Sequence, residues 1–311
     1  MEAILLVEAL RSLPATDFGP FRSADGKAWI AALPSLVDDL ARRWGLATAG
    51  GEFWHGYNSV VLPVSQGGRP LALKLTWPPE QALGEVAALA TWQARGAVKL
   101  VAVDTPHGAL LLERLNPARS LSALHVTEAA AIAGALIRTL AIEAPAETFP
   151  ALQDTADELA TTIPARQRSL HDLVPVDWVT LATSLAAFLA NDPQRLLVHT
   201  DLHYGNILAT QRPGQLWAAI DPVAASGAPE RSVAELLWTR ADELPDSQAI
   251  TGLLDVIVEN GQLDQPKAVA WGFVRTIDYW LWGLENDLTV DPVRCERIAA
   301  ALAPAAEAVR L

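Results

Sequence analysis

The sequence predicts an α+β protein with two lobes, a small lobe rich in antiparallel β-strands followed by a larger and mostly helical lobe. Strand-like segments concentrate before residue 115, and helix-like segments dominate after residue 116. Asn116-Pro117 interrupts the pattern between the two regions. The chain has 311 residues, of which 51% are hydrophobic, so it can bury a sizeable core. We therefore expect one lobe over residues 1–115 and another over residues 116–311.

The first 45 residues are predicted to be a helical addition to the first lobe. Apolar residues recur at helical spacing between residues 28 and 44, and Gly45 is suited to end a helix. Pro34 falls inside this stretch, so a kink or a restart of the helix is expected there.

The spacing of apolar residues changes to that of β-strands after residue 46. Strands over residues 60–64 and 71–75 flank a Gly67-Gly68 turn, which predicts an antiparallel hairpin. The remaining elements expected in this lobe are a helix over residues 79–94 and strands over residues 98–103 and 108–115.

The second lobe is predicted to be mostly helical, with two short strands inside it. The short strands, around residues 196–199 and 216–220, flank a loop rich in polar side chains. The predicted helices cover residues 120–142, 151–171, 177–190 and most of 229–311.

The loop between those short strands carries the residues that point to a chemistry. His199, Asp201 and Asn206 follow the pattern H-x-D-x-x-x-x-N, and Asp221 ends the next strand. A protein-kinase catalytic loop and its metal-binding Asp have this layout. In phosphoryl transfer, one Asp accepts the proton of the attacking hydroxyl, while the Asn and the later Asp hold Mg²⁺ on the ATP phosphates. We therefore predict Asp201 as the catalytic base and Asn206 and Asp221 as the magnesium ligands.

Two histidines support the same loop in this interpretation. His199 and His203 lie four residues apart, but the H-E-x-x-H pattern of a zinc helix is absent. His199 is expected to brace the loop through hydrogen bonds. His203 has two possible roles, a position close to the metal and phosphates or a second bracing contact.

Nucleotide-binding residues are predicted in the first lobe. Lys74 lies in the middle of an apolar strand, where a charge is costly unless it has a partner. In a kinase that lysine contacts the ATP phosphates and is held by a helix carboxylate, for which Glu85 is the better candidate. The alternatives are an edge-strand lysine with its ammonium in water and a solvated surface position for Glu85.

Further nucleotide contacts are expected from a turn and from a hinge. The sequence lacks a G-x-G-x-x-G loop, and residues 56–59 are the expected turn over the nucleotide, with Ser59 or a backbone N–H near phosphate. Residues 111–115 are the expected hinge, where backbone groups of Glu113 and Leu115 would bind adenine. The alternative for this segment is an ordinary buried strand.

Composition excludes several other classes of protein. The net charge is −13 and no basic run is present, so a nucleic-acid partner is not expected. No segment approaches the ~20 apolar residues of a membrane span, and the N-terminus lacks a basic leader. The single cysteine, Cys295, fits a reducing compartment. These observations predict a cytoplasmic protein.

Acidic residues are concentrated toward the C-terminal end of the chain. Between residues 231 and 290 there are ten Asp or Glu and four Lys or Arg. Asp278 and Trp282 share a helix face with Glu285 one turn on, and Glu235 is a weaker candidate of the same kind. Carboxylates and indole faces suit a cationic small-molecule substrate. The alternative is that the tryptophans pack in the core and the acids face water.

The chain resembles the aminoglycoside phosphotransferase superfamily, which has the protein-kinase fold. The resemblance rests on residues 199–206 and on Ile220-Asp221-Pro222, and it covers roughly residues 45–300. Residues 96–100, 110–115 and 220–223 are similar to the group of streptomycin 6-phosphotransferases and hydroxyurea-resistance kinases. Thr200 stands where that superfamily often has glycine, and residues 227–231 replace its Gly-Asp-Pro loop.

This resemblance implies ATP, Mg²⁺ and phosphorylation of a substrate hydroxyl. It also implies the same base, metal ligands and phosphate-binding lysine as the motif. Three hypotheses follow, of which the first is a kinase of an aminoglycoside such as streptomycin or a related aminated sugar. The second is a kinase of a simple metabolite such as glucosamine, and the third is a nucleotide-binding pseudokinase. A protein substrate is not expected, because no A-P-E motif follows the metal-binding Asp.

Overall fold

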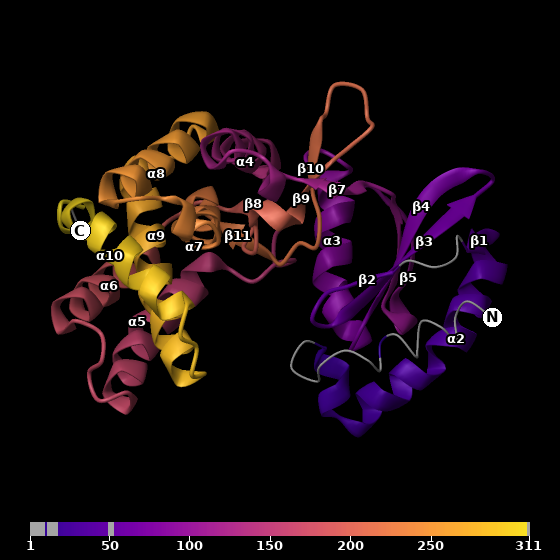
Figure 1. The fold of residues 1–311 in the computed structure, drawn as a ribbon, viewed down its shortest axis with the longest axis horizontal. Helices are drawn as coiled ribbons and strands as arrows, with labels where there is room; N and C mark the ends of the chain where they lie inside the picture. Colours follow the sequence, from indigo (N-terminus) through magenta and orange to yellow (C-terminus); the bar gives the residue numbers. More distant parts are fainter. Residues whose placement is uncertain (1–9, 11–17, 49–52, 310–311) are drawn as a thin grey trace. The chain divides into compact units, whose positions relative to one another are not determined.

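The computed structural model describes residue 10 and residues 18–48 and 53–309 (Figure 1). The chain forms two compact units. The first unit comprises the described residues up to Ala94 together with Val98–Leu115. The second unit comprises Arg95–Ala97 and the described residues from Asn116 onward. The predicted α+β class is confirmed, because an antiparallel sheet dominates the first unit and helices dominate the second.

The first unit begins with η1 (Gly19–Arg22) and the long helix α2 (Ala24–Trp44). Ser23 caps α2 by accepting a hydrogen bond from the N–H of Gly26 at 2.9 Å, so the helix starts earlier than residue 28. The helix continues through Pro34 without a restart and ends at Gly45, whose φ is +61°. Apart from Leu10, residues 1–17 of the region expected to be helical lie outside the described residues.

A six-stranded antiparallel sheet follows α2. Its strands are ordered β1-β3-β4-β6-β5, and β2 also pairs with β3. Gly67 and Gly68 both have positive φ, as a two-residue hairpin turn between β3 and β4 requires. The strands are β1 (Leu46–Thr48), β2 (Trp54–His55), β3 (Ser59–Gln66), β4 (Arg69–Thr76), β5 (Leu100–Asp104) and β6 (Ala109–Glu113).

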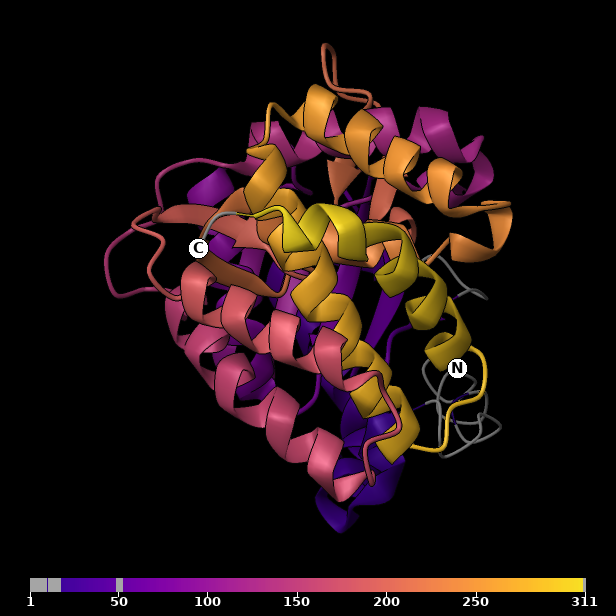
Figure 2. The same cartoon turned by 90° about the vertical axis from the view of Figure 1, so that its left-hand side faces the viewer.

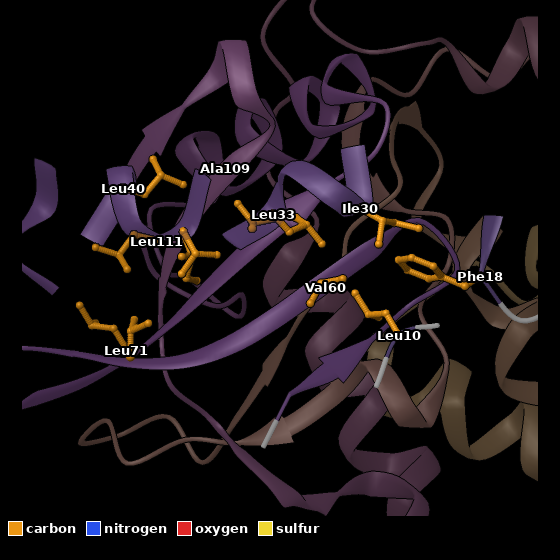
Figure 3. Close-up of a cluster of buried hydrophobic side chains, with 13 residues drawn as sticks. Leu10, Phe18, Ile30, Leu33, Leu40, Val60, Leu71, Ala109 and Leu111 are labelled. Atoms are coloured by element: carbon orange, nitrogen blue, oxygen red, sulfur yellow. The ribbon is translucent and has the colours of Figure 1, made fainter. Parts of the chain in front are cut away.

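One face of this sheet is packed against α2. Side chains of Ile30 and Leu33 from α2 lie in one hydrophobic cluster with Leu71 of β4 and Leu111 of β6 (Figure 3). Each such buried side chain contributes ~1.5–3 kcal/mol. Helix α2 is therefore part of the core of the first unit and not an addition to a finished lobe.

The predicted helix over residues 79–94 forms in two parts. A short 3₁₀ turn, η2 (Pro79–Gln81), leads into α3 (Ala82–Trp92). The helix ends at Gln93, which adopts a left-handed φ of +48°.

Two small antiparallel sheets lie in the second unit. One has the strand order β10-β9-β7 and the other pairs β11 with β8. The helix expected over residues 120–142 begins only at Val126 and ends at Leu140, because Ser120 belongs to β7 and Leu121–Ala123 form a separate 3₁₀ turn, η4. The strands are β7 (Asn116–Ser120), β8 (Leu196–His199), β9 (Ile207–Ala209), β10 (Trp217–Ala219) and β11 (Ala224–Gly227).

Helices make up the rest of the second unit. Figure 2 shows α5 and α6 side by side, with α9 packed against both. Helices α4 and α8 meet at Gly134, where a Cβ would lie 2.5 Å from the carbonyl oxygen of Ile257. In the part of the chain that the structure describes, no helix is long and apolar enough to cross a bilayer. The helices are α4 (Val126–Leu140), α5 (Leu152–Ser169), α6 (Val176–Leu189), α7 (Val233–Trp238), α8 (Ser247–Gly261), α9 (Gln265–Glu285) and α10 (Asp291–Glu307).

Candidate active site

The imidazole of His199 fixes the loop that joins β8 to β9. Its Nδ1 accepts a hydrogen bond from the backbone N–H of Asp201 at 3.2 Å. Its Nε2 lies 3.1 Å from the carbonyl oxygen of Ile220, to which it must donate. The ring is therefore the Nε2–H tautomer, and it connects Asp201 to the residue that precedes Asp221.

Asn206 is tied to the same two segments. Its side-chain Nδ2 donates to the carbonyl oxygen of Asp201 at 3.0 Å, and its own carbonyl accepts from the N–H of Ile220 at 2.9 Å. With the amide nitrogen committed to Asp201, the amide oxygen is directed elsewhere. An oxygen oriented in this way is the type of ligand that Mg²⁺ prefers.

Asp221 has an unusual backbone conformation. Its φ is +53°, a left-handed value that Asp adopts more readily than most residues. It follows β10 after Ile220 and is exposed. The chain therefore does not continue the direction of β10. The segment after Asp221 forms β11, which pairs with β8.

The electrostatic surroundings of Asp201 fit a cation. Burial, together with the nearby carboxylates of Glu235 and Asp221, raises the pKa of Asp201 to about 6, while Arg231 opposes the rise. A bound cation would relieve the repulsion between these acids. Within the described residues, no group of three or more His, Cys, Asp or Glu side chains could hold a metal. Mg²⁺ needs only two protein ligands when phosphates and water supply the others, so Asn206 and Asp221 fit it.

His203 makes a bracing contact within the loop. Its Nδ1 accepts from the N–H of Gly205 at 3.1 Å. A Cβ on Gly205 would lie 2.9 Å from Cε1 of the ring, so this close approach depends on glycine. Burial lowers the pKa of His203, which favours the neutral ring that this contact requires.

Two hydroxyl side chains fasten the loop to its surroundings. Thr200 donates to the carbonyl oxygen of Val223 from both its N–H, at 2.8 Å, and its Oγ1, at 3.1 Å. Ser232 donates from Oγ to the carbonyl oxygen of His199 at 2.9 Å. Ser232 was not among the predicted site residues, and its position after a Gly-Ala-Pro turn was the signal available in the sequence.

In the first unit, Lys74 and Glu85 form a buried ion pair. Nζ of Lys74 lies 2.6 Å from Oε2 of Glu85, and both side chains are about 5% exposed. Strand β4 lies between β3 and β6, so the edge-strand alternative for Lys74 is wrong. Glu85 is likewise not a solvated surface residue.

Ser59 shares a sheet face with Lys74. Opposing residues of antiparallel strands point to the same side, and alternate residues return to that side. Ser59 opposes Thr76, and Val61 opposes Lys74, so all four side chains lie on the face turned away from the α2 cluster. Ser59 is buried, at 6% exposure.

The expected hinge residues are part of the first unit's sheet or follow it directly. Glu113 ends β6, and its N–H donates to the carbonyl oxygen of Lys99 at 2.9 Å. Its side-chain Oε1 accepts from the N–H of Lys99 at 2.8 Å. Leu115 is buried at the last position of the first unit.

The predicted substrate acids of the second unit have arginine partners. Glu235 accepts two hydrogen bonds from Arg231, at 2.9 and 2.8 Å. Asp278 pairs with Arg166 at 2.6 Å and also with Arg275. Glu285 lies 3.3 Å from the same Arg166. None of these arginines was predicted, and only Arg231 and Arg275 stand one helical turn from their partners.

Three aromatic rings form a stack beside these ion pairs. Trp238 of α7 stacks on Tyr279 of α9, with ring centroids 4.7 Å apart and planes inclined by 22°. Tyr279 stacks in turn on Trp282 at 5.5 Å and 12°. Trp282 ends the stack and is 40% exposed, whereas Trp238 is buried.

Fold and site together define a kinase, a phosphotransferase with a protein-kinase-like fold. Residues 43–307 match the family described as aminoglycoside/hydroxyurea antibiotic resistance kinase, and the chain belongs to this family. The family resemblance drawn from the motif residues is thereby confirmed.

Two curated relatives span almost the whole chain. Streptomycin 6-kinase of Streptomyces glaucescens is 33% identical over 300 residues, which cover 94% of this chain and 96% of the relative. Hydroxyurea phosphotransferase of Kitasatospora aureofaciens is 34% identical over 289 residues, which cover 91% of this chain and 82% of the relative.

Solved structures agree on the fold. A thermostable mutant of aminoglycoside phosphotransferase APH(4)-Ia, in a ternary complex with ADP and hygromycin B, aligns with a TM-score of 0.61 at 16% identity. The alignment covers 86% of this chain and 97% of that structure. Choline kinase LicA from Streptococcus pneumoniae aligns with a TM-score of 0.53 at 14% identity, over 87% of this chain and 98% of that structure.

Proposed function

We propose that this protein transfers the γ-phosphate of ATP to a hydroxyl of a cationic aminated sugar of the streptomycin type. The observation that carries the proposal is the hydrogen-bonded unit of His199, Asp201 and Asn206, which is joined through Ile220 to Asp221. This unit would orient the carboxylate of Asp201 to accept a proton and the amide oxygen of Asn206 to bind a cation. The relatives named streptomycin 6-kinase give the substrate class.

Asp201 is the proton acceptor in this proposal. Its carboxylate orients the substrate hydroxyl and takes the proton late, as the new P–O bond forms. A pKa of about 6 makes it a better base than an ordinary aspartate and leaves it ionised at neutral pH. The γ-phosphoryl group leaves ADP in the same step.

Asn206 and Asp221 would hold Mg²⁺ on the phosphates. The metal, when bound, neutralises charge that develops on the transferring phosphoryl group. Lys74 would supply a further positive charge to the phosphates, and Glu85 holds its ammonium in place at 2.6 Å. Ser59 on the same sheet face would approach phosphate, and backbone groups of Glu113 and Leu115 would bind adenine.

We place substrate recognition on Trp282 and Glu285. Trp282 offers an exposed indole supported by a stack, which suits a sugar ring or a planar cation. Glu285 is 30% exposed and can accept a second cationic group beside Arg166. Glu235 and Asp278 are buried with their own arginines, so we assign them to the support of this surface.

A release assay for ADP distinguishes the possible substrates. Streptomycin, other aminoglycosides, hydroxyurea and free amino sugars such as glucosamine are tested with Mg-ATP, with Asp201→Asn as the control for background hydrolysis. We expect the fastest release with streptomycin. A preference for glucosamine would favour the metabolic alternative, and a preference for hydroxyurea would favour the activity named for the other relative. No release with any compound would favour a nucleotide-binding pseudokinase.

A further inference from the structure

The turn between β2 and β3, residues 56–59, is held by the segment that precedes α2. Within the turn, the N–H of Gly56 donates to the carbonyl oxygen of Ser59 at 3.0 Å. From outside, the N–H of Gly19 donates to the carbonyl oxygen of Tyr57 at 2.8 Å. Residues about forty positions apart in the chain are therefore joined by a backbone hydrogen bond.

The contact at Gly19 leaves no room for a side chain. A Cβ at this position would lie 2.6 Å from Oδ1 of Asn58 and 2.9 Å from the ring of Tyr57. Atoms at such distances overlap, so a larger residue at position 19 would displace the side chains of Asn58 and Tyr57. The φ of Gly19 is not in the left-handed region, so close approach alone requires glycine here.

An arginine from the same segment covers the turn. The guanidinium carbon of Arg22 lies 5.5 Å from the centroid of the Tyr57 ring. This distance is within the range of a cation–π contact. Arg22 is exposed and Tyr57 is 50% exposed, so the contact lies at the surface of the first unit.

The other side of the turn is tied to the segment between β4 and α3. The N–H of Trp77 donates to the carbonyl oxygen of Asn58 at 2.8 Å, and Nδ2 of Asn58 donates to Oε1 of Gln81 at 2.7 Å. Trp77 also stacks on Trp29 of α2, with centroids 6.1 Å apart. The N-terminal region thus contacts the turn directly and again through Trp77.

We propose that residues 18–22 form a positioning element, which holds the turn of residues 56–59 in the conformation that receives the triphosphate. The proposal rests on the proposed function, in which Ser59 and Lys74 share the face that meets the phosphates. The positioning element lies outside the matched family residues 43–307. Arg22 and Gly19 act through the turn and not on the nucleotide itself.

The test compares Mg-ATP with adenosine, which lacks the phosphates. Binding of both is measured by calorimetry for Arg22→Ala and for Arg42→Ala. Arg42 is a control on α2 whose side chain is 78% exposed, pairs with Asp39 and donates to the carbonyl oxygen of Asp38. We expect Arg22→Ala to weaken Mg-ATP binding by about 2- to 5-fold, as the strength of an exposed cation–π contact implies. Adenosine binding should not change, and Arg42→Ala should bind both like the parent protein.

Variants of the partner residue identify the contact. Tyr57→Phe keeps the ring and should bind Mg-ATP normally. Tyr57→Ala should lose as much Mg-ATP affinity as Arg22→Ala. The double variant of Arg22→Ala and Tyr57→Ala should lose no more affinity than either single variant. Gly19→Ala should lose at least as much Mg-ATP affinity as Arg22→Ala, because it displaces the side chains of both Asn58 and Tyr57. Equal losses for adenosine and Mg-ATP, or no loss, would overturn the proposal. Failure of the parent protein to bind Mg-ATP would instead reject the proposed function.

Discussion

The acids of the catalytic loop and the acids of α7 and α9 lie in the same unit in opposite electrostatic settings. Asp201 is close to two other carboxylates, those of Glu235 and Asp221, and its pKa rises to about 6. Asp278 is held by two arginines, and Glu235 by Arg231 with Arg275 further off, at 3.9 Å. Under the proposed function the catalytic loop would receive a cation and a proton, whereas Asp278 links α9 to α5 through Arg166. Residue type alone does not separate these roles, since both groups are Asp and Glu.

The largest expected effect comes from removing the base. Asp201→Asn should lower kcat for ADP release by about 10²–10⁴-fold, because a positioned general base contributes that much. Binding of Mg-ATP, measured by calorimetry, should change little. The hydrogen bond that orients Asn206 goes to the backbone carbonyl of Asp201, which the substitution keeps. Asp154→Asn, at an exposed position of α5, is the control. Normal turnover in Asp201→Asn would refute the assignment of the base.

The second largest expected effect is on folding stability and concerns the acids that pair with arginines. Glu235→Gln removes the charge that balances buried Arg231, and breaking a buried pair costs about 3–5 kcal/mol. Asp39→Asn is the control, because both side chains of its pair with Arg42 are exposed and such surface pairs contribute about 0–1 kcal/mol. Urea unfolding measures both. If the two variants were equally stable, the contrast between the two groups of acids would be lost.

The pH profile tests the ionisation of Asp201. Because Asp201 must be ionised to accept a proton, kcat/KM should fall about tenfold per unit as the pH drops below about 6. Its raised pKa means that ionisation costs folding stability, a cost absent below the ordinary value near 4 and present once the pH exceeds about 6. Asp201→Asn should therefore be more stable than the parent at pH 8. A profile that stays flat down to pH 5 would contradict this assignment.

The smallest expected effect concerns substrate binding at the end of the aromatic stack. Trp282→Ala should raise the KM for a cationic sugar by about 2- to 5-fold, corresponding to the ~0.5–1 kcal/mol of an exposed cation–π contact. Trp282→Phe keeps an aromatic face, so its KM should lie between those of the parent protein and Trp282→Ala. Glu285→Gln should make the same KM less sensitive to salt, because it removes an exposed charge. A KM that none of these changes would place the substrate elsewhere.

Much of the fold was predictable because local signals agreed with it. The two glycines of the β3–β4 turn and the strand–helix order identified the first unit, and the spacing of His199, Asp201 and Asn206 identified the loop. Strands β9 and β11 were missed, although β8 and β10, which are equally short, were predicted. They form through pairing with β10, β7 and β8, which sequence spacing does not show.

The predicted site was less complete where partners are distant in sequence. The pair of Lys74 and Glu85 followed from a charge in an apolar strand and a helix soon after it. Arg166 and Asp278 are 112 positions apart in the sequence, so no local pattern predicted their pairing. As a result, the acids near Trp282 were predicted as substrate contacts, although two of them are buried with arginines.

The hydrogen bonds of His199 have a consequence for the recovery of the enzyme between turnovers. Nδ1 accepts from the backbone and Nε2 donates to it, so this imidazole is not positioned to relay the proton that Asp201 has taken. Under the proposed function, the carboxyl of Asp201 would then release its proton without the help of His199. At neutral pH a carboxyl with a pKa of about 6 is mostly ionised, so loss of the proton would be favourable without that histidine.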